Sequence, residues 1–145
     1  APPAPREGLV TKRLVGGGGA SLPVLNGPEG VRLLTVNRQH IAVEDGRVFL
    51  TGLSVGALAD ADGRLEALAE AVVRAMPGLH GIFGIDILLT DTGPVVVEVN
   101  PRLTTAYAGI GAALGLNPAT LLPPFADAAA APHAGTCAPV ELALA

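Results

Sequence analysis

The sequence predicts an α+β fold, in which helices pack on a mostly antiparallel sheet. Short runs rich in β-branched residues and Leu alternate with turn sequences such as "NGPEG" and "EDG", which is typical of antiparallel strands. A segment near the middle of the chain has apolar residues at helical spacing. The chain has 145 residues and is 50% hydrophobic, which is enough for one domain with a buried core.

The first elements expected are three antiparallel strands. They correspond to the runs "SLPVL" (21–25), "VRLLTVN" (31–37) and "RVFLTGL" (47–53). Each run is short enough for a strand and is bounded by Gly, Pro, Asn or Asp. The turn signals "NGPEG" and "EDG" separate these runs, which favours antiparallel strands.

One amphipathic helix is expected in "DGRLEALAEAVVRAMPG" (62–78). The apolar residues that fall on one face of this helix are Leu65, Leu68, Ala69, Val72, Val73 and Met76. Asp60 or Asp62 can cap the start of the helix, and Pro77 with Gly78 should end it.

A hairpin is expected next, formed by "GIFGIDILLT" and "PVVVEV" around a "DTG" turn. The nearly continuous apolar character of both arms predicts that both strands are buried on both faces. The stretch "TTAYAGIGAALGL" should then form a helix, and "NPATLLPPF" should begin another, with Asn117 as cap and Pro118 at its first position.

Composition sets the boundaries and excludes several partners. We expect a linker or tail over 1–8, the folded subdomain over 9–125 and an Ala/Pro-rich tail over 126–145. The net charge is −4 with nine basic residues, so no basic surface for nucleic acid is expected. No apolar run is long enough to cross a membrane. The single cysteine, Cys137, and the lack of a signal segment favour the cytoplasm.

Four polar residues interrupt the apolar stretch "GIDILLTDTGPVVVEVNPR" (84–102) at regular intervals. Because side chains alternate along a strand, Asp86 shares a face with Leu88, and Glu98 shares a face with Asn100. A tight turn brings Glu98 opposite a residue near Asp86, so three oxygen-bearing side chains should converge. Oxygen ligands without His or Cys favour Mg²⁺ or Mn²⁺.

Such a metal site implies a phosphate-bearing ligand, because protein-bound Mg²⁺ usually keeps positions for water and substrate phosphates. Arg102 follows Asn100 at the strand exit, where its guanidinium could contact phosphoryl oxygens. Taken singly, each of these residues is more often structural than functional. A buried Glu98, however, would need a cationic partner, since an unpaired buried carboxylate is costly.

The stretch "GIDILLTDTGPVVVEVNPRLTTAYAGI" resembles the carboxyl-terminal half of an ATP-grasp domain. In that family an acidic residue on one strand and a Glu-x-Asn-x-Arg motif on the next hold magnesium between the phosphates of ATP. The motif positions here are Asp86, Glu98, Asn100 and Arg102. The sequences "NPRLTT" and "LLTVNRQHI" narrow the resemblance to the branch of uncharacterised carboxylate–amine ligases that includes tyramine–glutamate ligase.

The resemblance implies further roles. Arg38 would face the phosphates or an acyl phosphate, and Leu88 and Val97 would pack against adenine. The implied activity is ATP- and Mg²⁺-dependent amide formation between a small carboxylate and an amine through an acyl phosphate, with Arg102 as a catalytic residue. Of the adenine contacts, Leu88 has independent support because it shares a face with Asp86.

The resemblance also implies a preceding segment with a phosphate-binding lysine, whereas the only lysine here is Lys12. That segment would belong to the same chain or to a partner chain, and a homodimer is a further alternative. Two hypotheses follow. The chain is the metal-binding half of an ATP-grasp ligase, or it is a degenerate, non-catalytic binding module with the same fold and no activity of its own.

Overall fold

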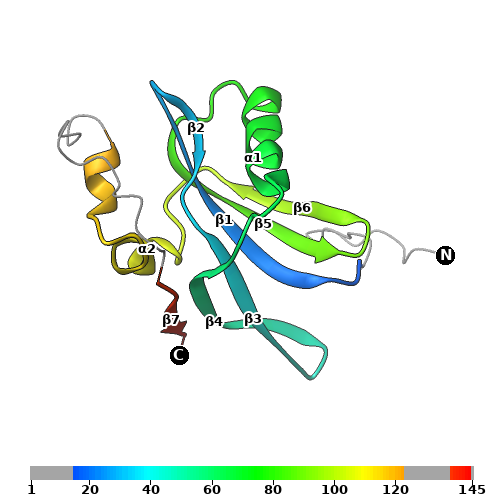
Figure 1. Cartoon of the computed structure of the whole chain (residues 1–145). Coiled ribbons are helices and arrows are strands. Elements are labelled where there is room, and N and C mark those ends of the chain that lie inside the picture. Colours follow the sequence, from blue (N-terminus) through cyan, green and yellow to red (C-terminus); the bar gives the residue numbers. More distant parts are fainter. Residues whose placement is uncertain (1–14, 123–137, 145) are drawn as a thin grey trace, which may run out of the picture.

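The centre of the fold is one antiparallel sheet of seven strands in the computed structural model, which describes residues 15–122 and 138–144 (Figure 1). Its elements are β1 (Gly18–Gly27), β2 (Gly30–Leu33), β3 (Val36–Glu44), β4 (Arg47–Leu58), α1 (Arg64–Ala75), β5 (Gly81–Thr90), β6 (Gly93–Asn100), α2 (Tyr107–Leu114), the 3₁₀ helix η1 (Pro118–Leu121) and β7 (Val140–Ala143). The strands lie in the order β6-β5-β1-β3-β4-β7, and β2 pairs with β1. The predicted α+β class with a mostly antiparallel sheet is confirmed.

Strand β1 lies at the centre of the sheet and has two neighbours along one edge. Its first half pairs with β3 and its second half pairs with β2, while β5 runs along the other edge. The single strand predicted over 31–37 is therefore wrong, because the chain breaks between β2 and β3. Pro23 of β1 accepts a hydrogen bond from the Leu34 backbone N–H but has no N–H to return, which interrupts the ladder at this point.

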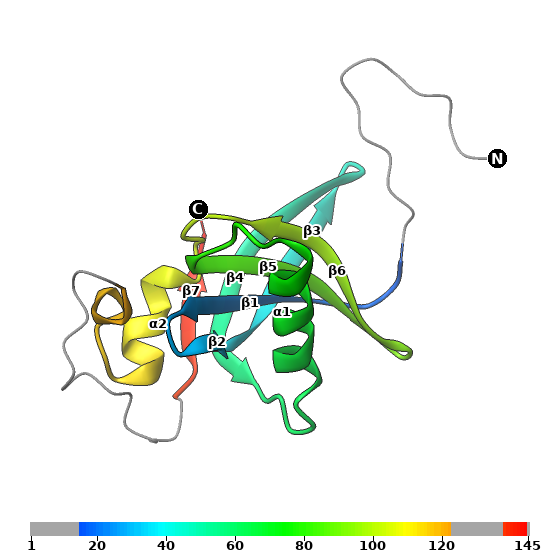
Figure 2. The same cartoon turned by 90° about the horizontal axis from the view of Figure 1, so that it is seen from above.

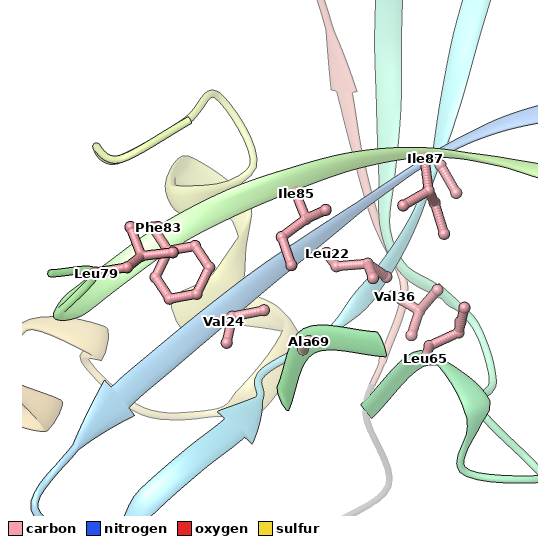
Figure 3. Close-up of a cluster of buried hydrophobic side chains, with 10 residues drawn as sticks. Leu22, Val24, Val36, Leu65, Ala69, Leu79, Phe83, Ile85 and Ile87 are labelled. Atoms are coloured by element: carbon pink, nitrogen blue, oxygen red, sulfur yellow. The ribbon is translucent and has the colours of Figure 1, made fainter. Parts of the chain in front are cut away.

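The main hydrophobic core lies between the sheet and α1, as Figure 3 shows. Alternate residues of β1 and β5 point to this side, which we call the α1 face. Its fully buried members include Ala20, Leu22, Val24, Phe83, Ile85 and Ile87. Leu65 and Ala69 of α1 pack against them, so the predicted helix and its apolar face are confirmed, except at Met76, which follows the helix and is exposed.

Both aspartates proposed as caps bind the first turn of α1. The two carboxylate oxygens of Asp60 accept from the backbone N–H groups of Leu65 and Glu66, at 3.0 and 2.9 Å. Asp62 accepts from the Arg64 N–H at 3.3 Å. These bonds satisfy donors that have no partner inside the helix, while Gly63 occupies the cap position itself.

A second, smaller core packs on the opposite face of the sheet, beneath α2. Ile110 and Ala113 of α2 contact Leu53 and Val55 of β4, and strand β7 lies beside them at the edge of the sheet (Figure 2). Thus the segment 126–145, expected to be a tail, contributes a strand that pairs with β4. The helix expected at Asn117 is a single 3₁₀ turn, in which the Asn117 side chain accepts from the Ala119 N–H.

The prediction that both arms of the hairpin are buried is correct for β5 and wrong for β6. Strand β6 forms the edge of the sheet and has only β5 as a neighbour among the described residues. Val95, Val96 and Val97 are therefore 37–41% exposed, and Glu98 is also exposed. An apolar run on an edge strand cannot be distinguished from a buried strand by its sequence alone.

A β-bulge at Val97 sets which residues of β6 face which side. From the turn, Leu88 pairs with Val95 and Ile87 with Val96, but Asp86 then pairs with Glu98. In a regular ladder without a bulge, Val97 would pair with Asp86. The bulge therefore turns Glu98 and Asn100 towards the side of the sheet that carries Asp86.

No helix among residues 15–122 and 138–144 is long and apolar enough to cross a membrane. The predicted linker over 1–8, Lys12 and Cys137 lie outside the described residues.

Candidate functional site

A cavity of about 200 Å³ opens on the sheet face opposite α1, which we call the cavity face. It collects residues from β1, β3, β4, β5, β6 and the segment before α2. The lining residues are Ser21, Gln39, Leu50, Leu53, Asp86, Glu98, Asn100, Arg102, Thr104, Thr105 and Ala106. Most of these side chains are polar, so the cavity is suited to a charged ligand.

Asp86, Glu98 and Asn100 meet at this cavity, as their spacing predicted. Asp86 pairs with Glu98 across the two strands, and Asn100 is the next β6 residue on the same face. The Asn100 side-chain Nδ2 donates to Asp86 Oδ2 at 3.0 Å. Asn100 is 8% exposed, whereas Glu98 is exposed. The cluster thus has a fixed inner part and an outer carboxylate open to solvent.

The pKa of Asp86 reflects its burial and the charges around it. Burial raises the pKa of the Asp86 carboxyl group, and the neighbouring Glu98 carboxylate raises it further. Hydrogen bonds from Asn100 and Gln39 and the charge of Arg102 lower the same pKa, but the net effect is a raised pKa. A cation between Asp86 and Glu98 would relieve both the burial of charge and the repulsion.

Arg102 reaches the cavity from the turn that follows β6. Its Nη2 donates to Asn100 Oδ1 at 3.4 Å, and its Nη1 donates to the Leu103 carbonyl at 3.2 Å. The backbone N–H of Arg102 also donates to the Asn100 carbonyl at 2.7 Å, which tightens the turn. The guanidinium therefore lies beside the carboxylate cluster and is held by local contacts.

Gln39, Ser21, Thr104 and Thr105 also line the cavity, although their sequence context did not predict them as site residues. Gln39 Nε2 donates to Asp86 Oδ1 at 2.9 Å, although β1 lies between their strands. Ser21 is the partner of Asp86 on β1. The alternation of β3 would have placed Gln39 on a different face from Arg38, but the strand order needed to bring it near Asp86 is not visible in the sequence.

A buried asparagine fixes the strands beneath the cavity. Asn37 is fully buried, its Nδ2 donates to Ser21 Oγ at 3.2 Å, and its Oδ1 accepts from the Gly56 N–H at 2.9 Å. These bonds join β1, β3 and β4. Because both polar atoms of its side chain have a partner, Asn37 can hold the floor of the cavity rigid.

The three remaining residues predicted for the site do not line this cavity. Arg38 is exposed and pairs with Ala20, so it points to the α1 face, away from Asp86. Leu88 is on the cavity face, where it pairs with Gly19 and Val95, beyond the carboxylates. Val97 is the bulge residue next to Glu98.

The donor set fits a hard divalent cation. Asp86, Glu98 and Asn100 offer two carboxylates and one amide oxygen, and the described part of the chain contains no group of three His, Cys, Asp or Glu side chains that could hold a metal. Zinc usually takes nitrogen or sulfur ligands, whereas Mg²⁺ and Mn²⁺ accept carboxylate and amide oxygens.

Several known proteins resemble this chain. Tyramine–L-glutamate ligase of Methanocaldococcus jannaschii is 28% identical over 104 residues, which cover 72% of this chain and 32% of that protein. A crystal structure of an Archaeoglobus fulgidus protein assigned to the ATP-grasp superfamily is 34% identical, with a TM-score of 0.60 over 75% of this chain and 35% of that one. This chain therefore spans about a third of the length of these relatives.

More distant structures share the fold. L-amino acid ligase of Bacillus licheniformis is 17% identical, with a TM-score of 0.60 over 74% of this chain and 30% of its own. At this level of identity the likeness concerns the fold alone. The sequence model of the ATP-grasp domain matches residues 2–106, which is most of the chain and contains the whole carboxylate cluster. The chain belongs to the ATP-grasp family.

Proposed function

We propose that this chain is the metal-binding half of an ATP- and Mg²⁺-dependent carboxylate–amine ligase that works through an acyl phosphate. The observation that carries the proposal is the meeting of Asp86, Glu98, Asn100 and Arg102 at one cavity in a chain of the ATP-grasp family. The complete activity belongs to a protein of the length of the relatives, of which this chain spans about a third.

In this proposal Asp86, Glu98 and Asn100 hold Mg²⁺ or Mn²⁺. The raised pKa of Asp86 supports it, because burial disfavours the charged carboxylate and the Glu98 carboxylate repels it, and a cation would offset both effects. A bound cation would neutralise phosphate charge and orient the phosphates of ATP. Asn100 would serve through its Oδ1, since its Nδ2 already donates to Asp86.

The apolar part of the cavity face is our candidate for the adenine contact. Leu88 lies between Gly19 and Val95 in the cross-strand register, and Val97 directly precedes Glu98 in β6. These positions form an apolar surface next to the carboxylates. Leu88 and Val97 therefore keep the role proposed for them, whereas we assign no catalytic role to Arg38, which lies on the other face.

The reaction would proceed in two displacements. An oxygen of the substrate carboxylate attacks the γ-phosphorus of ATP, and ADP leaves with the electrons of the broken P–O bond. The amine nitrogen then attacks the acyl carbon, inorganic phosphate leaves, and the nitrogen loses a proton to give the amide. Arg102 would hold phosphoryl or acyl-phosphate oxygens with its planar donors, so catalysis would depend on positioned charge.

The substrate class follows from chemistry and from the relatives. The names tyramine–L-glutamate ligase and L-amino acid ligase both indicate an enzyme that joins a small acid to another molecule. We infer a small carboxylate and an amine as substrates here. The remaining part of the active site, including a phosphate-binding lysine, would come from further residues of the same chain or from a partner chain.

The alternative function is a binding module without turnover. It is favoured by one observation, which is that the only lysine of the sequence is Lys12, outside the matched carboxylate cluster. Under this alternative the metal cluster would still bind Mn²⁺, but a protein extended to the length of the relatives would form no amide from ATP, an acid and an amine.

The metal site is tested by titrating the 145-residue chain with Mn²⁺ by calorimetry. We expect binding that Glu98→Gln weakens, while Glu44→Gln, which removes a carboxylate from the far end of β3, leaves it unchanged. Equal binding by Glu98→Gln and the parent chain would show that the site is misassigned. Amide formation by a protein extended to the length of the relatives would support the ligase, and its absence would support the binding module.

A further inference from the structure

Gln39 makes a contact that spans three strands. It lies on β3, Asp86 lies on β5, and β1 runs between them. The Gln39 Nε2 nevertheless donates to Asp86 Oδ1 at 2.9 Å, so its side chain crosses over β1 on the cavity face. Cross-strand contacts usually join neighbouring strands. The Gln39 side chain therefore needs room above β1 to reach Asp86.

Two small residues of β1 provide that space. A Cβ atom on Gly19 would lie 3.1 Å from Gln39 Oε1 and 3.3 Å from Gln39 Cβ, closer than nearly all real contacts of this kind. Ser21, the next β1 residue on this face, is the register partner of Asp86. A larger residue at position 19 would force the Gln39 side chain to move. The small side chains of β1 at these positions thus leave room for the Gln39 side chain.

The contact completes the support of the Asp86 carboxylate. Oδ1 accepts from Gln39 and Oδ2 accepts from Asn100, so each oxygen has one amide donor. The donors come from β3 and β6, on opposite sides of β5 in the sheet. With both oxygens held, the carboxylate has one orientation, and each oxygen keeps a lone pair for another ligand.

We propose that Gln39 is a positioning residue of the metal site, which holds the Asp86 carboxylate in the orientation that receives the cation. This inference rests on the proposed function. A glutamine suits the role because its amide donates a hydrogen bond without adding charge. Lysine or arginine would neutralise Asp86 and compete with the cation, and glutamate would supply no donor.

The main test compares Mn²⁺ affinity of the parent chain with that of Gln39→Met, which keeps the length of the side chain and removes the donor. We expect the dissociation constant to rise about 10-fold or more, as for the loss of other residues that orient metal ligands. Gly19→Ala should weaken binding in the same direction, because it displaces Gln39. Glu44→Gln, on the same strand, serves as the control.

A purely structural role would give a different result. It would lower the melting temperature of Gln39→Met in a chelator and leave the Mn²⁺ affinity of the folded protein unchanged. If the parent chain binds Mn²⁺, Glu98→Gln loses binding and Gln39→Met binds as the parent does, then the positioning role is wrong and the metal site stands. If the parent chain binds no Mn²⁺, the metal site and the positioning role fall together.

A second measurement follows the Gln39 side chain directly. Gln39 is the only glutamine of the sequence, so ¹⁵N labelling of glutamine side chains gives one pair of amide signals. We expect these signals to shift in Asp86→Asn, which changes the acceptor, and to broaden when Mn²⁺ is added. Signals that neither move in Asp86→Asn nor broaden with Mn²⁺ would overturn the proposal, whatever the affinity of Gln39→Met.

Discussion

Asp86 is the residue at which stability and the proposed function oppose each other. Burial and the Glu98 carboxylate raise its pKa, and two amide donors together with Arg102 only partly offset this. Such an arrangement is unfavourable for the folded protein without a cation. It is useful where a cation has to bind, because removing the repulsion contributes to the binding free energy.

Glu98→Gln tests this balance in the metal-free chain. The substitution removes the repulsion that raises the Asp86 pKa, so in a chelator near neutral pH we expect a melting temperature the same as or up to a few degrees above that of the parent. The gain should stay below about 1 kcal/mol, because Glu98 is exposed and its charge is screened by water.

The pH dependence of this gain has a definite sign. A raised pKa means that the folded chain binds a proton on Asp86 more tightly than the unfolded chain does, so stability from this group falls as pH rises from about the ordinary value of 3.8 through the raised value. The advantage of Glu98→Gln should therefore appear above this window and vanish below it. A gain that is equally large at acid pH would contradict the assignment.

Arg102 is the residue whose proposed role concerns catalysis most directly. In a protein extended to the length of the relatives, we expect Arg102→Lys to lower kcat by a factor on the order of 10², because lysine keeps the charge but loses the planar donors. Nucleotide affinity should change little. Measured kcat near the parent value together with a lower melting temperature would mean that Arg102 only ties down the turn through Asn100 and Leu103.

Among the elements, strand β6 shows how a bulge sets the pairing at the candidate site. The bulge at Val97 changes the pairing so that Glu98 lies opposite Asp86. Bulges are common near active sites, where they redirect side chains. The exposed edge position of β6 allows this irregularity, since only one neighbouring ladder has to adapt.

Deleting Val97 should therefore remove the bulge and retain Mn²⁺ binding while the sheet still forms. After the deletion, the regular count from the turn brings Glu98 opposite Asp86, so its carboxylate stays on the cavity face. Calorimetry measures the binding, and far-ultraviolet circular dichroism checks the fold. Loss of Mn²⁺ binding in a folded deletion variant would show that the register described for β5 and β6 does not place the ligands.

Strand β7 depends on a glycine of its neighbour. A Cβ on Gly52 would lie 2.6 Å from the Leu142 carbonyl oxygen, so β4 and β7 could not approach as they do. We expect Gly52→Ala to destabilise the chain by about 1–3 kcal/mol, the usual cost of overpacking. Gly18→Ala is the control, because nothing lies within 4 Å of its added Cβ. Equal melting temperatures for the two variants would show that β7 is not docked as described.

At the scale of the whole molecule, the cavity is only one side of the site that we propose. The chain spans about a third of its relatives, and the apolar part of the cavity face is exposed at Ile41 and Leu50. A triphosphate held from one side stays in contact with water, which screens its interactions with the metal and Arg102.

We therefore expect the 145-residue chain to bind ATP·Mg²⁺ with micromolar affinity at best and to form no amide. Isothermal calorimetry and a phosphate-release assay measure the two properties. A chain extended to the length of the relatives should bind more tightly and turn over. Amide formation by the 145 residues alone would show that they form a complete active site.

Much of the local structure could be predicted from the sequence. The apolar spacing of residues 64–75 identified α1, and the "DTG" turn identified the β5–β6 hairpin. The convergence of Asp86, Glu98 and Asn100 also followed from alternation along two strands joined by a tight turn. These features depend on residues close together in the chain, whose geometry is set by local backbone preferences.

The sequence by itself thus determined the class of the fold, the helix, the hairpin and the convergence of Asp86, Glu98 and Asn100. Only the tertiary structure decided that β6 is an exposed edge, that Val97 is a bulge, that 140–143 joins the sheet and that Gln39 crosses β1 to Asp86. Each of these depends on which strands are neighbours. Strand order is set by packing and pairing between distant segments, and no local pattern of residues records it.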